Sequence, residues 1–230
     1  MPRRRSVDEL AKAIRRAAEE ALAPDDVRFE RGSERPLGRK GRHTRANILK
    51  AAADVFQEAG WTGSSIAAIA DSAGVGVGTV YQYFRSKEEM VAAIVGEWTV
   101  RSLSEVKAWN PEEGVEGLRR LIHRFVTMYA TTAGFQRLWE EVSLVDPALG
   151  RLRDDVTELF VNLFAESFIA ASKARLLDAG PDPVETSRAV NAMIERYCLQ
   201  VFVRHSRTVT PNQAGDLLTG LVLGALQVRQ

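Results

Sequence analysis

Apolar residues recur every three or four positions along almost the whole chain, and no stretch alternates between apolar and polar residues as a half-buried strand does. This period predicts an all-α protein. Prolines, glycines and helix-capping residues interrupt the pattern and set the ends of the helices. The predicted helices cover approximately residues 6–23, 44–59, 65–72, 76–84, 86–108, 112–131, 134–145, 151–178, 183–206 and 211–228.

The composition is that of an ordinary globular protein with one large domain or two small ones: 45% of the 230 residues are apolar and 27% are charged. No apolar run reaches the roughly 20 residues of a membrane-spanning helix, and the first residues lack the apolar stretch of a secretory signal. The single cysteine, Cys198, excludes an internal disulfide framework and is expected to be buried rather than to act as a redox sensor. We therefore expect a cytoplasmic protein with no membrane partner.

Positive charge is concentrated in one segment. Residues 35–87 contain eight lysines and arginines against three acidic residues, whereas the residues after them are acidic on balance. A basic block of this kind is typical of a surface that meets phosphates, but it also occurs as a solvated run of charge. Charge alone does not separate the two interpretations.

The segment 65–84 has the spacing of a helix-turn-helix motif. Ala70 is small where two helices would cross, and Gly74 provides a turn residue that tolerates a positive φ. Val80 then returns to a core that is expected to include Ile66, Ile69, Val75 and Phe84. The alternative is a plain helical hairpin inside a bundle. The polar residues on the other side of the second helix favour a surface that is free to enter a major groove.

The stretch from Thr44 onward closely resembles the N-terminal DNA-binding domain of the TetR family of transcriptional regulators. The resemblance covers about 60 residues and rests on Thr44-Arg45, Phe56, Gly60-Trp61, Ile69-Ala70, Ala73-Gly74-Val75, Gly78-Thr79-Val80-Tyr81, Tyr83-Phe84 and Ser86-Lys87. It implies a three-helix DNA-binding domain over 42–102 and a helical ligand-binding and dimerisation domain over 103–230. Residues 1–41 have no counterpart in the family pattern and are expected to form an extension.

The resemblance also implies the residues that contact DNA. By position in the family pattern, the residues expected to contact phosphates are Thr44 or Arg45, Ser65, Thr79, Tyr81, Gln82, Tyr83 and Lys87. Base edges are approached by Ala67, Gly76, Val77, Gly78 and part of Tyr81. The family often has a lysine where Val77 stands and a serine where Gly76 stands, so this chain offers few side chains for hydrogen bonds to bases.

A basic arm precedes the first helix of this domain. Residues 28–41 are polar and glycine-rich, which predicts a flexible segment. Arginines on such arms enter narrow minor grooves, so Arg39 and Arg42 are predicted to contact A·T-rich DNA beside each half-site. The alternative is an arm that adds only non-specific charge.

The second domain carries polar groups on otherwise apolar helices, which would suit a small hydrophobic effector with one or two polar ends. The candidate ligand-binding residues are His123, Tyr129, Trp139, Asn162, Phe164, Glu195 and Tyr197. Ordinary core or surface positions explain each of them equally well. Scattered histidines and the lack of a catalytic constellation predict no metal site, no cofactor and no enzymatic activity.

These features together predict a ligand-responsive repressor that binds a palindromic operator in double-stranded DNA as a homodimer. The last two predicted helices are apolar on more than one face, and we expect them to pair with a second copy. The alternative is an all-α small-molecule carrier or enzyme that does not bind DNA.

Overall fold

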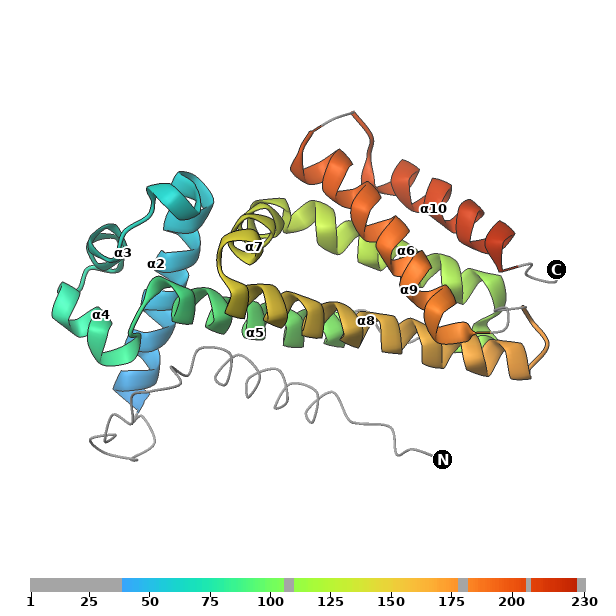
Figure 1. Ribbon diagram of the computed structural model, residues 1–230, viewed down its shortest axis with the longest axis horizontal. Helices are drawn as coiled ribbons and strands as arrows, with labels where there is room; N and C mark the ends of the chain where they lie inside the picture. Colours follow the sequence, from blue (N-terminus) through green and yellow to red (C-terminus); the bar gives the residue numbers. More distant parts are fainter. Residues whose placement is uncertain (1–38, 106–109, 178–181, 206–207, 227–230) are drawn as a thin grey trace. The chain divides into compact units, whose positions relative to one another are not determined.

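The computed structural model describes residues 39–105, 110–177, 182–205 and 208–226, and within these ranges it contains helices and no strand. The helices are α2 (Arg39–Gly63), α3 (Ile66–Ala73), α4 (Val77–Tyr83), α5 (Lys87–Glu105), α6 (Gly114–Thr131), α7 (Ala133–Val145), α8 (Pro147–Lys173), α9 (Pro183–Cys198) and α10 (Pro211–Ala225), with a 3₁₀ turn over Pro111–Glu113 and a π turn over Leu199–Val203 (Figure 1). The prediction of an all-α fold is confirmed. The predicted helix over 6–23 lies outside the described residues.

The chain divides into two compact units. The first contains the described residues up to Val100 together with Leu138–Arg153, and the second contains Arg101–Arg137 and the described residues from Asp154 onward. Helices α5, α7 and α8 therefore contribute residues to both units. The predicted second domain, 103–230, includes residues 138–153, whereas the structure groups this segment with the first unit.

The beginning of α2 differs from the prediction. The helix starts at Arg39, five residues before the predicted start, so the prediction of a flexible arm over Arg39–Gly41 is wrong for these residues. Lysine and arginine favour helices, and the hydroxyl of Thr44 donates to the carbonyl of Lys40 at 3.1 Å inside the helix. Arg39 and Arg42 are both exposed on this first part of α2.

Two other helix limits have local causes. Helical geometry stops at Gly60, whose φ of 69° and ψ of −178° suit glycine, and the predicted end at this residue is confirmed. Helix α8 begins at Pro147 rather than at 151. Proline is favourable at the first helical position, and the carboxylate of Asp146 accepts from the amide of Leu149 at 2.8 Å.

The core of the first unit forms where α2, α3, α4 and α5 turn their apolar sides inward. Its fully buried members include Ile48, Leu49, Phe56, Ile69, Val80, Phe84, Met90 and Val91. Ile66 and Val75 were predicted to be core residues but are only half-buried. This small core fixes the angle between α3 and α4, and thereby the surface that α4 presents.

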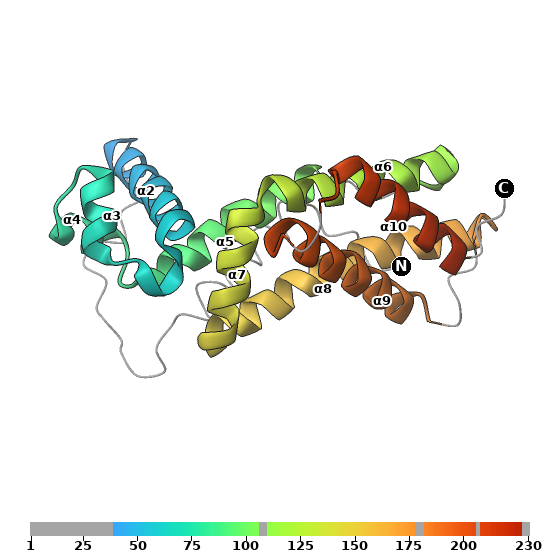
Figure 2. The same cartoon turned by 90° about the horizontal axis from the view of Figure 1, so that it is seen from above.

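The second unit is built on a chain of aromatic contacts. Phe125 of α6 meets Phe160 of α8 edge-on, with ring centroids 5.6 Å apart, and Phe164 at 5.9 Å. Phe168 continues the series along α8, 6.3 Å from Phe164. Helix α10 lies along α6 in both views (Figures 1 and 2), where Leu218 and Val222 are buried. No helix in the described ranges is long and apolar enough to cross a membrane.

Cys198 is buried at the end of α9, and its thiol is expected to be unreactive. Burial, and secondarily the charge of Glu195, raises its pKa from 9.0 to about 12. The thiolate fraction at pH 8 is then on the order of 1000-fold smaller than in an unfolded chain. We expect the native protein to resist Ellman's reagent at pH 8 and one thiol to react after denaturation. Reaction of the native thiol within minutes would contradict this.

The same shift predicts a pH dependence of stability. The folded-state pKa lies above the unfolded value of 9.0, so folding favours the neutral thiol. This contribution is complete below about pH 9 and is lost as the pH rises toward 12. The free energy of unfolding of Cys198→Ala, measured by urea unfolding at several pH values, is expected to fall less between pH 9 and pH 12 than that of the unchanged protein.

Candidate DNA-binding surface

The joint between α3 and α4 is fixed by backbone geometry. Ser65 caps α3, with its hydroxyl accepting from the amide of Ala68 at 3.1 Å, and Gly74 closes the helix in the left-handed region at φ 66°. The amide of Val75 donates back to the carbonyl of Ala70 at 3.0 Å. The predicted role of Gly74 in the turn is confirmed. Ser65 fixes the start of α3, while Gly74 and the bond from Val75 make a tight turn at its end.

A side chain of α2 secures the same turn from behind. The amide of Asn47 donates to the carbonyl of Ala73 at 2.8 Å, which satisfies a backbone acceptor at the end of α3. Sequence analysis missed this role, because the two residues are 26 positions apart. The turn of the motif is therefore held by the helix that precedes it.

Helix α4 has one buried and one open side. Val80 is fully buried, whereas the side chains of Val77 and Tyr81 are 41% and 54% exposed, although both are large and apolar. These two lie one turn apart on the same face. Gln82 is exposed beside them, and Gly76 and Gly78 leave the backbone uncovered at the start of the helix. The open side of α4 therefore presents Val77 and Tyr81 to solvent next to uncovered backbone.

Most of the predicted DNA contacts gather around this open side. Ser65 and Ala67 are exposed on and beside α3, while Thr79 and Tyr83 are half-buried on α4. The structure thus brings the residues of α3 and α4 into one motif, as the resemblance implied. Thr44 and Arg45 are half-buried on α2.

Arg45 already has partners within the protein. Its guanidinium lies over the ring of Phe84, 5.0 Å from the centroid, and is 3.8 Å from the carboxylate of Glu97. The aromatic contact holds the arginine against the C-terminal end of α4. The side chain remains about one-third exposed, so it can still meet a phosphate at this edge.

Lys87, predicted to hold a phosphate, is bound internally in this structure. Its ammonium donates to the carbonyls of Trp61 and Ser64 at 2.9 Å each and to the hydroxyl of Ser64 at 3.1 Å. It also lies over the Trp61 ring, 4.2 Å from the centroid. An ammonium has three donors, so all of them are used. A phosphate contact would require the release of one of these acceptors.

A carboxylate holds the same loop from another helix. Glu141 of α7 accepts a hydrogen bond from the amide of Trp61 at 3.4 Å. Lys87 and Glu141 therefore both bind the segment that joins α2 to the helix-turn-helix. Neither interaction could be found from the sequence, since each links residues that are far apart in the chain.

The predicted ligand-binding residues are scattered over the structure. Tyr129 and Phe164 are buried in the aromatic series of the second unit, and Trp139 is buried in the first unit. Asn162 is exposed, which does not suit an enclosed pocket, and Glu195 and Tyr197 are half-buried on α9. Among these candidates, Tyr129 and Phe164 lie in one cluster, because both contact Phe125.

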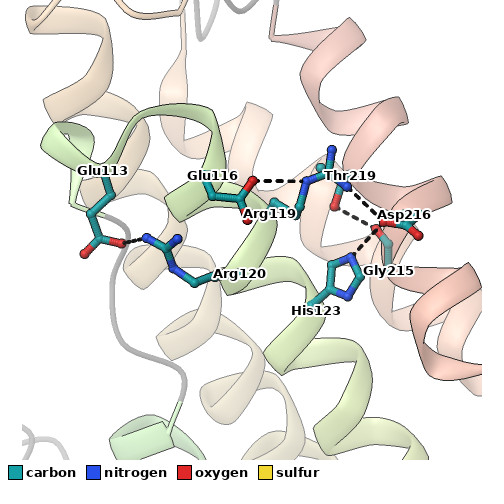
Figure 3. A network of polar contacts seen from close by, with 8 residues as sticks. All are labelled: Glu113, Glu116, Arg119, Arg120, His123, Gly215, Asp216 and Thr219. Carbon is teal, nitrogen blue, oxygen red and sulfur yellow. Dashed lines mark hydrogen bonds and ion pairs between the residues drawn. The ribbon is translucent and has the colours of Figure 1, made fainter.

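His123 joins two helices of the second unit. Its imidazole packs against the backbone of Gly215, and its Nε2 lies 3.2 Å from the carboxylate of Asp216 on α10 (Figure 3). Arg119, one turn earlier on α6, donates to the same carboxylate at 2.8 Å. These contacts give His123 a role in the packing of α10 on α6.

Comparison with known proteins agrees with this geometry. Residues 48–94 match the family model described as bacterial regulatory proteins of the tetR family. The chain is 31% identical over 99 residues to the HTH-type transcriptional regulator UidR of Escherichia coli K12, which covers 43% of this chain and 50% of the relative. The chain therefore spans half the length of this curated relative.

Two further likenesses extend beyond the helix-turn-helix. The transcriptional activator FasR of Mycolicibacterium smegmatis is 26% identical over 165 residues, covering 65% of this chain and 75% of the relative. The solved structure of the flavonoid-responsive regulator FrrA superposes with a TM-score of 0.64 at 24% identity, over 82% of this chain and all of the other. Their names describe regulators and not enzymes. The motif and these matches lead to one conclusion: residues 48–94 form a DNA-binding domain of the type found in bacterial regulators of the TetR family, and the chain as a whole is similar to such regulators in fold.

Proposed function

We propose that this protein is a DNA-binding transcriptional repressor, which binds a palindromic operator as a homodimer and is released by a small hydrophobic effector. The observation that carries the proposal is the open side of α4, with Val77 and Tyr81 exposed on a helix whose other side is locked in the core. Helices presented in this way enter the major groove of DNA.

On DNA, the proposed contacts fall into two classes. Ala67, Gly76, Val77 and Gly78 approach base edges, where Val77 meets a thymine methyl group and the glycines let the backbone come close. The phosphates are met by the polar residues around them, namely Ser65, Thr79, Gln82, Tyr83, Thr44 or Arg45, and Lys87 if its ammonium is released. Tyr81 contributes to both classes. This surface offers few side chains that can form hydrogen bonds to base edges. Its discrimination between bases therefore rests on DNA shape and on contacts with thymine methyl groups.

Arg39 and Arg42 are proposed to add phosphate contacts from the first turns of α2. Both are exposed and lie on a helix rather than on an extended strand of chain. A helix is too wide for a narrow minor groove, so the predicted entry of these two arginines into that groove would require α2 to unwind.

Binding to duplex DNA tests the proposal against a carrier or enzyme without DNA binding. The operator is sought among random duplexes by repeated selection, and affinity is measured by fluorescence anisotropy at several salt concentrations. We expect Tyr81→Ala to weaken operator binding at least tenfold, about 1.4 kcal/mol, because it removes a groove contact. Leu144→Ala, which truncates a more exposed apolar side chain on α7, is the matched control. If no duplex is selected, the carrier or enzyme is favoured.

The proposed homodimer uses the outer side of α10. Leu217 and Leu221 are about half exposed there, and a Cβ added at Gly220 between them would touch nothing. Leu218 and Val222, on the inner side, are covered by the chain itself. Apolar residues therefore lie on more than one side of the helix, as predicted, and those on the outer side are not covered by the described residues of the chain.

The prediction for this interface is a change of mass in solution. Leu221→Lys would place a charge in the centre of a closed apolar contact, so we expect a monomer in sedimentation equilibrium at micromolar concentration, where the unchanged protein is a dimer. Leu144→Lys is the control, because its side chain is exposed on α7. A dimer that survives Leu221→Lys would place the interface elsewhere.

A further inference from the structure

Two polar side chains on the inner side of α9 have no partner. Ser187 and Asn191 are one helical turn apart, 0% and 2% exposed, and share their side of the helix with Val190 and Ile194. The hydroxyl oxygen of Ser187 and the carbonyl oxygen Oδ1 of Asn191 are sealed from solvent. No group in the described part of the chain makes a hydrogen bond to either atom.

Three other buried hydroxyls in the described ranges have hydrogen-bond partners. Thr99, Ser167 and Thr219 each donate to the carbonyl four residues earlier in their own helices, at 2.8, 3.1 and 2.7 Å. The Oδ1 atom of Asn191 cannot be satisfied by a backbone carbonyl, because it is an acceptor and requires an N–H or O–H donor. Buried polar groups without partners are rare in native proteins, and each one calls for an explanation.

A second copy of the chain does not provide the missing donor. Both atoms are already covered by their own chain, so an outer interface cannot reach them. The partner must lie inside the second unit, between α9 and the helices that surround it. Those helices are α6 and α10, and also α8, which is joined to α9 by the ion pair of Glu158 with Arg188.

The buried residues of the neighbouring helices are mostly apolar. Phe125, Phe160 and Phe164 are among those of α6 and α8, and no charged residue is among the buried residues of the described ranges. Arg188, the cation next to Ser187 in the chain, is already held by Glu158 and Glu185. A carboxylate ligand would therefore meet the acceptor Oδ1 of Asn191 without a free cation beside it.

We propose that Ser187 and Asn191 hold the polar end of a neutral apolar ligand, one that carries a hydroxyl or an amide N–H. Asn191 accepts a hydrogen bond from the ligand through Oδ1, and the hydroxyl of Ser187 donates to it or accepts from it. The apolar body of the ligand packs against the phenylalanine side chains. The inference rests on the proposed function, because this ligand is the effector, and it narrows the effector to neutral hydrogen-bond donors.

Three probes with a ten-carbon chain differ only in their polar end: 1-decanol, decyl methyl ether and decanoate. They separate a hydrogen-bond donor from a neutral acceptor and from a carboxylate. Binding to the full chain is measured by titration calorimetry. We expect saturable binding of the alcohol, about tenfold tighter than that of the ether, which lacks a donor, and of decanoate. Asn191→Leu is expected to abolish the preference for the alcohol, and Ser187→Ala to reduce it. Asn162→Leu, on the exposed side of α8, is the matched control and is expected to keep the preference.

Several outcomes would overturn the inference. These are no saturable binding of the alcohol, equal binding of alcohol and ether, or a preference that persists in Asn191→Leu. If Asn191→Leu raises the melting temperature while no probe binds, the two atoms hold an enclosed water only. Operator binding by the ligand-free variants is measured in parallel. If the unchanged protein does not bind the operator, the proposed function is wrong. If it binds the operator but shows no preference for the alcohol over the ether, only this inference is wrong.

Discussion

Replacing Lys87 with methionine is expected to lower the free energy of unfolding of the first unit by about 2–4 kcal/mol, the sum of several hydrogen bonds from a charged donor and a cation–π contact. Methionine keeps the apolar stem but leaves the carbonyls of Trp61 and Ser64 without their donor. Those carbonyls follow the end of α2 at Gly60, so the segment that leads into the helix-turn-helix should loosen. Thermal and urea unfolding measure the loss.

Lys50→Met provides the control for this experiment, because Lys50 is exposed on α2. Its removal should change stability by less than about 0.5 kcal/mol. Hydrogen exchange of the amides of residues 60–65 should accelerate in Lys87→Met and not in Lys50→Met. Equal unfolding midpoints for the two variants would show that the ammonium does not hold this loop.

Gly215→Val is expected to destabilise the second unit by about 2–3 kcal/mol, the usual cost of overfilling a packed contact. A Cβ at this position would lie 2.7 Å from Cε1 and Nδ1 of His123, closer than atoms can approach. The imidazole cannot simply turn aside, since its Nε2 is engaged with Asp216. Helix α10 would have to move away from α6.

A double-mutant cycle makes this prediction specific. His123→Ala removes the ring that the new side chain meets, so Gly215→Val should cost much less in that background. We expect a coupling energy of about 1–2 kcal/mol from urea unfolding of the four proteins. Additive effects would mean that the close packing of Gly215 on His123 does not hold α10 in place.

The features that could be predicted from the sequence are those fixed within a few residues. The cap at Ser65, the left-handed turn at Gly74 and the helix end at Gly60 each depend on a residue and its immediate neighbours. Ser86 likewise caps α5 locally, accepting from the amide of Glu89 at 3.3 Å. The recognition surface was predictable for the same reason, because it lies on one short motif.

The remaining features depend on contacts between distant residues. Lys87 is 26 positions from Trp61, and Glu141 is 80 positions from it, so nothing local marks them as partners. The start of α8 is a different case, because it depends on neighbouring residues. Asp146 caps the helix and Pro147 occupies its first position, whereas the sequence prediction treats this proline as an interruption between two helices. Over Arg39–Gly41, the prediction of a flexible arm rests on the glycines of this segment. The neighbouring lysine and arginine residues favour a helix, and the helix forms.

The bare beginning of the recognition helix bears on how such a regulator changes its target during evolution. A side chain added at Gly76 or Gly78 would meet no atom within 4 Å, and neither residue has a positive φ. At Gly78, inside α4, any ordinary residue would raise helix stability by up to about 1 kcal/mol. A single amino-acid substitution could therefore introduce a hydrogen-bonding serine, asparagine or lysine there without a prior gain of stability elsewhere. New operator preferences would then be open to this lineage at no cost to folding, a freedom that most binding surfaces lack.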